Sequence, residues 1–139
     1  MQMSDADDLR AILDSQARPV CAELTPFELL DADAASGFVK LAFAPQPAFG
    51  NHFGHIQGGF AVAMLDVVLS LAAFVKLHQW LPTVEIKCSF LAPAKLGTCI
   101  GEGRVIRAGR SLVFLEGKLW GADGELAAHA TATASVRAS

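Results

Sequence analysis

The stretch at residues 55–75, HIQGGFAVAMLDVVLSLAAFV, determines how the rest of the chain must fold. Within residues 58–75 only Asp66 carries a charge, and the other residues are small or apolar apart from Ser70. This run predicts a helix over about residues 57–77, with a length of about 30 Å. An apolar helix of this length must be covered by other elements, so the flanking segments should supply that cover.

The segments on both sides of the predicted helix show the patterns of strands. Two strands surround a loop at residues 32–36, and prolines end the second one. After Pro82 the apolar residues alternate with a period of two, and turns divide this region into four further strands, which we expect to form an antiparallel meander. A short helix over residues 5–16 precedes them, because Ser4 and Asp7 resemble a capping box.

These elements predict an α+β architecture with the helix as its filling. A curved antiparallel sheet of about six strands would wrap around one long central helix and bury it on nearly all sides. Neither a linker nor a repeat divides the sequence, so we expect a single domain over residues 1–139, with residues 1–20 as an N-terminal helical extension.

Composition and charge narrow the functional classes. The chain is 53% hydrophobic and 18% charged, which favours a packed core over disorder. Its formal net charge of −3 offers no overall attraction for nucleic acid. Three cysteines without CxxC spacing favour neither a disulfide framework nor a metal site, and they fit a reducing compartment. The acidic N-terminus does not resemble a signal peptide, so we expect a cytoplasmic protein.

The apolar helix also raises the possibility of a membrane span. Its length is close to the minimum for crossing a bilayer. However, Asp66 lies at its centre, where a charge costs about 2.5–3.5 kcal/mol on insertion scales. We therefore favour a core helix and expect no membrane partner.

Asp66 has small helical neighbours, and the opposite side of the helix is bulky. Gly59, Ala63 and Ser70 lie within seven residues of Asp66 on its side. The bulky residues that we expect in the core are Phe60, Met64, Val67, Leu71 and Phe74. Small residues around a carboxylate leave room for a ligand, or alternatively let another backbone pack closely and bond to Asp66. The pattern alone leaves both interpretations open.

Gln57, Gly58 and Gly59 open the helix. The N–H groups of a first helical turn have no partner within the helix, and they point outwards at the positive end of the helix dipole. Such an end stabilises an oxygen that gains negative charge in a reaction. Gly58 and Asp66 are eight residues apart, which is about 12 Å along a helix, so one carbonyl cannot touch both. Two antiparallel chains could bring the two groups together, which suggests a site shared by a dimer.

Taken together, Asn51, the Gly54 loop, residues 57–59, Asp66 and the stretch TVEIKCSFLAPAKLG at residues 83–97 resemble the hotdog-fold acyl-CoA thioesterases of the phenylacetic-acid-degradation (PaaI-like) type. The resemblance covers about residues 38–135. It implies an enzyme that hydrolyses an acyl- or aryl-acyl-coenzyme A to the free acid and coenzyme A. It also implies a homodimer or a dimer of dimers, and no cofactor, because coenzyme A is part of the substrate.

The resemblance assigns roles to individual residues. Asp66 matches the aspartate that acts as nucleophile or general base, and the Gly58 N–H matches the group that polarises the thioester carbonyl. Asn51 matches the loop asparagine, and Thr83 matches the residue that positions the attacking water. The usual motif is His-Gly-Gly, and here Gln57 takes the place of the histidine. A glutamine can donate a hydrogen bond, but it does not titrate near neutral pH.

Coenzyme A also needs a binding surface. In the family its nucleotide end binds at strand ends, where this sequence places Arg107, Gly109, Arg110 and Ser111. The charges of the two arginines could pair with phosphates. An ordinary solvated hairpin would carry similar charges. The resemblance also implies that Phe90 lines the pantetheine tunnel, although a core aromatic residue fits that position equally.

Two other functions fit parts of the pattern. A hotdog hydratase or dehydratase would carry Asp-x-x-x-x-His at the start of the helix, whereas Leu71 stands five residues after Asp66. A binding protein that holds acyl-CoA without cleaving it fits the replacement at Gln57. Release of free thiol separates the hydrolase from the binding protein.

Overall fold

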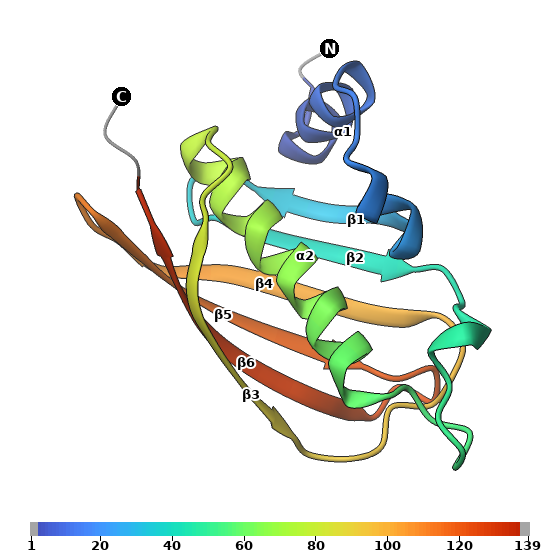
Figure 1. Cartoon of the computed structure of the whole chain (residues 1–139). Helices are drawn as coiled ribbons and strands as arrows, with labels where there is room; N and C mark the ends of the chain where they lie inside the picture. The colour runs from blue at the N-terminus through green and yellow to red at the C-terminus, as the bar shows by residue number, and fades with distance from the viewer. Residues whose placement is uncertain (1–2, 137–139) are drawn as a thin grey trace.

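The computed structural model describes residues 3–136, which form one long helix against a curved six-stranded sheet (Figure 1). In chain order the elements are α1 (Asp5–Ser15), the 3₁₀ helix η1 (Val20–Leu24), β1 (Phe27–Asp33), β2 (Phe38–Phe43), the 3₁₀ helix η2 (Pro47–Phe49), α2 (Gly58–Leu77), β3 (Thr83–Phe90), β4 (Cys99–Ala108), β5 (Leu112–Trp120) and β6 (Leu126–Ser135). The predicted α+β fold, with a central helix and six strands, is confirmed.

The strand order differs from the expected meander. The sheet has the order β1-β2-β4-β5-β6-β3, with every neighbouring pair antiparallel. The prediction of four consecutive neighbours was therefore wrong for β3, which pairs with β6 at the edge of the sheet while β4 lies beside β2. Burial explains this order. On β2, Val39, Leu41 and Phe43 are fully buried and suit the interior of the sheet, whereas most of β3 is exposed and suits an edge.

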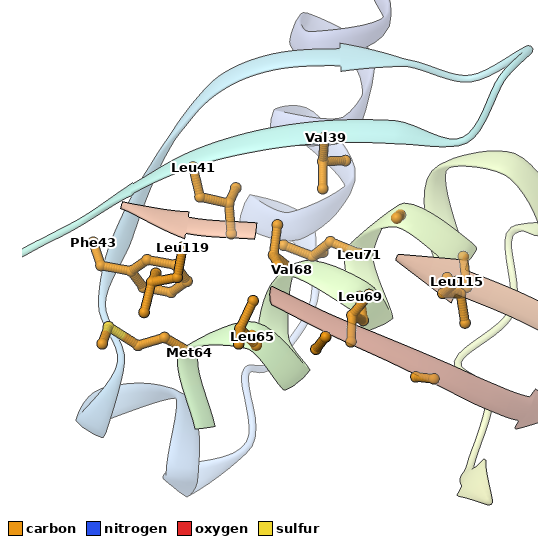
Figure 2. Close-up of a cluster of buried hydrophobic side chains, with 14 of the residues drawn as sticks. Val39, Leu41, Phe43, Met64, Leu65, Val68, Leu69, Leu71, Leu115 and Leu119 are labelled. Atoms are coloured by element: carbon orange, nitrogen blue, oxygen red, sulfur yellow. The ribbon is translucent and has the colours of Figure 1, made fainter. Parts of the chain in front are cut away.

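The core lies between α2 and the face of the sheet that the helix crosses. Figure 2 shows Leu65, Val68 and Leu69 of the helix among side chains from β2 and β5. A glycine on β4 permits the close approach of helix and sheet, because a Cβ on Gly103 would lie 2.5 Å from the carbonyl oxygen of Val68. The helix ends at His78, whose left-handed backbone and N–H bond to the Phe74 carbonyl oxygen close the last turn.

One stripe of α2 stays uncovered, which contradicts the expectation of burial on nearly all sides. Asp66 and Gly59 are exposed, and Ser70 is half-buried. Phe60 was expected in the core but is 40% exposed, with its ring stacked 4.3 Å from that of Phe49. The reason is that the sheet covers one side of the helix only, so residues on the far side have few neighbours within the chain, such as Phe49 beside Phe60 and Thr83 beside Asp66.

Helix α2 is also long and apolar enough to cross a membrane, although 56% of its apolar stretch is buried inside the structure. The core helix of a soluble protein can have the same length and composition. The packing of Leu65, Val68 and Leu69 against the sheet is that of a core helix.

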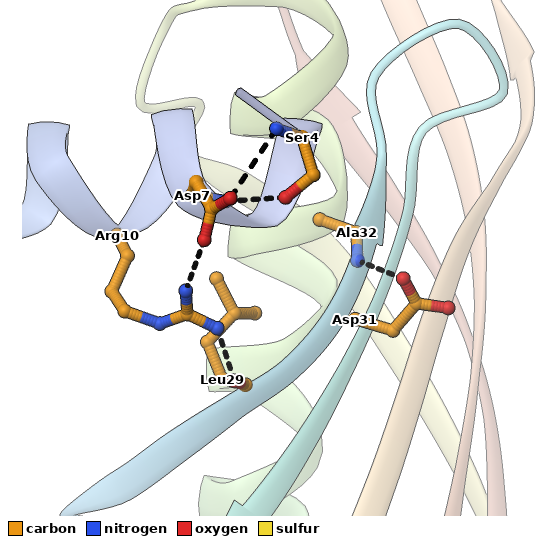
Figure 3. A network of polar contacts seen from close by, with 6 residues as sticks. All are labelled: Ser4, Asp7, Arg10, Leu29, Asp31 and Ala32. Carbon is orange, nitrogen blue, oxygen red and sulfur yellow. Dashed lines mark hydrogen bonds and ion pairs between the residues drawn. The ribbon is translucent and has the colours of Figure 1, made fainter. Parts of the chain in front are cut away.

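The N-terminal helix α1 is tied to β1. Ser4 and Asp7 form the predicted capping box, which fixes the start of the helix. Arg10 donates from Nη1 to Asp7 and from Nη2 to the carbonyl oxygen of Leu29 on β1, both at 2.9 Å (Figure 3). Asp5 accepts the Ala34 N–H at 2.7 Å. These bonds hold α1, and the chain that follows it, in a defined position against the sheet.

Candidate active site

Asp66 lies in the middle of the uncovered stripe of α2. Asp66 is exposed in the single chain, although the helix was expected to be buried on nearly all sides. Thr83, the first residue of β3, donates its hydroxyl to Asp66 Oδ1 at 3.4 Å, which is a long hydrogen bond. The structure therefore brings together these two predicted residues, with the small side of the helix open beside them.

The N-terminus of α2 presents free backbone donors. Gln57 is the N-cap residue, and its own N–H donates to the carbonyl oxygen of Phe49 at 2.8 Å. Its side chain is exposed and makes no capping hydrogen bond. The Gln57 carbonyl oxygen accepts the N–H groups of Phe60 and Ala61. The N–H groups of Gly58 and Gly59 have no partner within the helix, so they can bind an oxygen from a ligand.

Asn51 organises the loop that leads into this helix. Its side-chain oxygen accepts the N–H of Phe53 at 2.9 Å and that of His55 at 3.1 Å. Its backbone N–H donates to the carbonyl oxygen of His55 at 2.7 Å, and its carbonyl oxygen accepts the N–H of Gly54. These bonds use the side-chain oxygen, and the two N–H groups of the amide remain as donors. Asn51 thus fixes the loop and keeps donors for a ligand.

Phe90 lies beside the start of α2. Its ring carbon Cζ is 3.1 Å from the position that a Cβ on Gly58 would take, and 58% of the residue is exposed. Asn51, Gly58 and Phe90 line one cavity of about 410 Å³. Phe90 therefore lines a cavity and is not a core aromatic residue.

Asp66 and Ser70 line a different cavity, with a volume of about 310 Å³. Its other wall comes from the end of α1, from η1 and from Trp80. Sequence reasoning assigned no function to this N-terminal segment. The signal in the sequence was a short, mostly apolar run, VCAEL, at residues 20–24 between two prolines, which has no helical or strand period.

The predicted residues therefore form two separate groups within one chain. Thr83 and Asp66 lie together, and Asn51, Gly58 and Phe90 lie together. Along the helix Gly58 and Asp66 are about 12 Å apart, as calculated from the helical rise. A single small carbonyl group cannot contact both within one copy.

The basic turn is the β4–β5 connection around Gly109, and it lies away from both of these groups. Its residues Arg107, Gly109, Arg110 and Ser111 are all exposed. The Gly109 N–H donates to the carbonyl oxygen of Leu112 at 2.8 Å, and this bond closes the turn. Figure 1 shows this connection at the end of the sheet opposite to the N-terminus of α2. The chain alone thus does not bring the basic turn to Gly58.

Cys99 is buried and Cys88 is half-buried. Burial raises the pKa of the Cys88 thiol, and burial together with the nearby Asp123 carboxylate raises the pKa of the Cys99 thiol. Cys21, in contrast, is exposed. Among residues 3–136 no group of three His, Cys, Asp or Glu side chains is arranged to hold a metal ion.

A long helix against one face of a six-stranded antiparallel sheet, with an uncovered carboxylate on the helix and free N–H groups at its start, defines a hotdog-fold protein. The model of the Thioesterase superfamily matches residues 53–128, which is more than half of the chain. The chain belongs to this superfamily.

Individual proteins are also similar to this chain. A phenylacetic acid degradation-related protein of Ralstonia eutropha JMP134, provisionally named a thioesterase, is 30% identical, with a TM-score of 0.82 over 96% of this chain and 100% of that one. A protein of Saccharolobus solfataricus with the provisional name of an esterase is 34% identical over 83 residues, 59% of each chain's length. The protein smu.793 of Streptococcus mutans UA159, solved bound to acetyl CoA, is 20% identical, with a TM-score of 0.75 over 88% of this chain and 94% of that one. The predicted resemblance to hotdog thioesterases of the PaaI-like type is confirmed.

Proposed function

We propose that this protein is an acyl-CoA thioesterase that hydrolyses an acyl- or aryl-acyl-coenzyme A to the free acid and coenzyme A. The observation that carries the proposal is the Asp66–Thr83 pair on the uncovered stripe of an otherwise apolar helix. Membership of the Thioesterase superfamily supports hydrolysis of thioesters in general. The acetyl CoA bound to the streptococcal neighbour supports coenzyme A as the thiol. We also propose a cytoplasmic location, where coenzyme A thioesters are available.

Asp66 supplies the chemistry by one of two routes. As a general base it takes a proton from water while the water oxygen adds to the thioester carbon. The carbon–sulfur bond then breaks, and the proton passes to the leaving sulfur to give the free thiol. As a nucleophile its oxygen adds to the carbon and expels the thiolate, and water then hydrolyses the resulting anhydride. In both routes the Gly58 N–H stabilises the negative charge on the carbonyl oxygen.

A complete site requires a second copy of the chain. Within one copy the donor at Gly58 is too far from Asp66, whereas an antiparallel partner can supply one of the two groups. Strand β3 pairs with β6 on one side, and its other side is a sheet edge that carries exposed apolar residues such as Val84. We therefore propose a homodimer, or a dimer of dimers, with the active site between copies. Light scattering at micromolar concentration should show at least a dimer.

The remaining predicted residues bind the rest of the substrate. Phe90 forms a wall for the pantetheine arm beside Gly58, where the cavity is open. Arg107 and Arg110, on the turn closed at Gly109, pair with the phosphates of the nucleotide, with Ser111 as a further donor. This turn lies far from Gly58 within one copy. A partner chain must therefore bring its turn close to the Gly58 site, so that one substrate molecule can contact both.

The test is the substitution Asp66→Asn, which keeps the size of the side chain and its ability to bond to Thr83. We expect kcat for acyl-CoA hydrolysis, measured as free thiol, to fall by about 10² or more. Glu28→Gln is the matched control, because Glu28 is an exposed carboxylate on β1 that lines neither cavity. A folded Asp66→Asn protein with normal kcat would refute the role. A wild-type protein that binds acyl-CoA but releases no thiol would be a binding protein instead.

A further inference from the structure

The cavity of about 310 Å³ beside Asp66 is built by two parts of the chain that are distant in sequence. One wall is α2, and the other is the segment at residues 13–27, which comprises the end of α1, the 3₁₀ helix η1 and the start of β1. Most of its lining is apolar, with side chains from Leu13, Pro19, Ala22, Phe27, Leu71 and Trp80. We infer that this cavity holds the acyl group of the substrate, so that the N-terminal extension sets the acyl-chain specificity. This inference rests on the function proposed above.

The position of Asp66 shows which end of the cavity would receive the thioester. Asp66 lines the cavity and is exposed, so the cavity opens at the carboxylate that is proposed to attack the thioester. Ser70 and Leu71 line it further along the same helix. An acyl chain whose carbonyl carbon lies at Asp66 would therefore extend along α2 into the cavity. The thioester sulfur and the coenzyme would remain on the outer side.

The size of the cavity selects the class of acyl group. Pockets for small molecules usually have volumes of about 300–1,000 Å³. A volume of about 310 Å³ is at the lower end of this range, which suits an alkyl chain of medium length or a phenylalkyl group and is too small for the whole coenzyme A thioester.

The walls of the cavity are held in place. The Trp80 ring stacks on Phe74 with 4.1 Å between the ring centroids. The Arg18 guanidinium lies 5.7 Å from the centroid of the Phe27 ring, which places a charged group at the rim. The bonds from Arg10 to Leu29 and from Ala34 to Asp5 fix α1 against the sheet, so the extension forms a wall of defined shape.

Ala22 and Val20 provide a matched pair of variants within η1. Ala22 is half-buried and lines the cavity, whereas Val20 is 83% exposed and does not. Ala22→Trp fills the cavity, and Val20→Trp adds the same ring outside it. Each methylene that is excluded from the cavity should lower kcat/KM about fourfold. Three excluded methylenes should therefore lower kcat/KM for octanoyl-CoA about 60-fold in Ala22→Trp, with less than a twofold change for acetyl-CoA. Val20→Trp should leave kcat/KM unchanged for both substrates.

Cys21 allows a second test on the folded wild-type protein. It is exposed and lines the cavity, whereas burial raises the pKa of the other two thiols and slows their reaction with a maleimide. The probe is S-octyl-coenzyme A, a thioether that cannot be hydrolysed, and S-ethyl-coenzyme A is its short control. We expect the octyl compound to slow the labelling of Cys21 at least fivefold and the ethyl compound to leave it unchanged. Mass spectrometry of the labelled peptide measures both rates.

The two tests distinguish a failure of the acyl-cavity proposal from a failure of the proposed hydrolysis. If octanoyl-CoA and acetyl-CoA lose activity equally in Ala22→Trp, and the octyl compound does not protect Cys21, the acyl cavity is refuted even though hydrolysis occurs. If the wild-type protein cleaves no thioester but the octyl compound protects Cys21, the cavity is supported and the hydrolytic function fails.

Discussion

Replacing Gly58 with proline should remove one backbone N–H from the proposed site and leave the fold intact. Gly58 is the first residue of α2, and the first helical position tolerates proline because its N–H makes no helical bond. A residue before proline prefers an extended backbone, and Gln57 already has φ −62° and ψ 138°. The three atoms nearest to a Cβ at position 58 all belong to the exposed ring of Phe90, which can shift.

The loss of this N–H should lower kcat by about 10²–10³, the usual effect of removing one donor to a developing oxyanion. The assay is thiol release at saturating acyl-CoA, with circular dichroism and light scattering to confirm folding and oligomeric state. Gly58→Ala is the control for the added carbon, because it keeps the N–H and meets the same ring. A folded Gly58→Pro protein that retains the kcat of Gly58→Ala would refute the role of this N–H.

The same variant tests whether the site is shared between copies. A heterodimer of Gly58→Pro and Asp66→Asn chains, purified through two different tags, has one site with both lesions and one with neither, provided that each site takes Gly58 from one copy and Asp66 from the other. It should therefore recover about half of the wild-type activity per dimer. A heterodimer as inactive as its two parents would place both groups in one chain and contradict the proposed arrangement.

Three further outcomes are expected. Replacing Arg107 and Arg110 with alanine should raise KM for an acyl-CoA severalfold and weaken its salt dependence, but should not change hydrolysis of a short thioester that lacks the nucleotide; an equal loss for both would make the turn structural. Gly103→Ala should lower the free energy of unfolding in urea by about 1–3 kcal/mol, because its Cβ would lie 2.5 Å from a carbonyl oxygen of α2; an unchanged midpoint would contradict this packing. Hydrogen bonds from Ser4, and then the charge of Arg10, hold the pKa of Asp7 below its usual value. The contribution of the Asp7 carboxylate to stability is therefore present above pH 4 and is lost as the pH falls further. The difference in the free energy of unfolding between wild type and Asp7→Asn should shrink at low pH.

The elements of the fold could be predicted because their signals are local. The apolar run predicted α2 to within one residue of Gly58–Leu77, and the capping box at Ser4 and Asp7 predicted the start of α1. Strand order could not be predicted in the same way. A period of two identifies β3 as a strand but does not name its partner, and the long connection through α2 lets that strand reach the far edge of the sheet.

In the candidate site, too, the sequence showed the types of the residues but not how they are packed. The chemical types of Asp66, Thr83 and Gly58 were visible in the sequence, and the structure places the first two within hydrogen-bonding distance. The exposure of Asp66 was not predictable, because small residues around a carboxylate look the same whether its own chain or another copy covers them. The part of the wall between α1 and β1 carries no periodic pattern, so its part in a cavity becomes visible only when α1 is packed against β1.

The edge strand β3 explains why an antiparallel partner suits this site. Thr83, at the start of β3, contacts Asp66, and Phe90, at its end, contacts the Gly58 position. If two copies pair antiparallel along this edge, the start of β3 in one copy lies opposite its end in the other. The Asp66 group of one copy then lies beside the Gly58 group of its partner, and two equivalent sites form. Parallel pairing would instead place the two Asp66 carboxylates on the same side of the interface, where their charges repel and neither has the donor of Gly58.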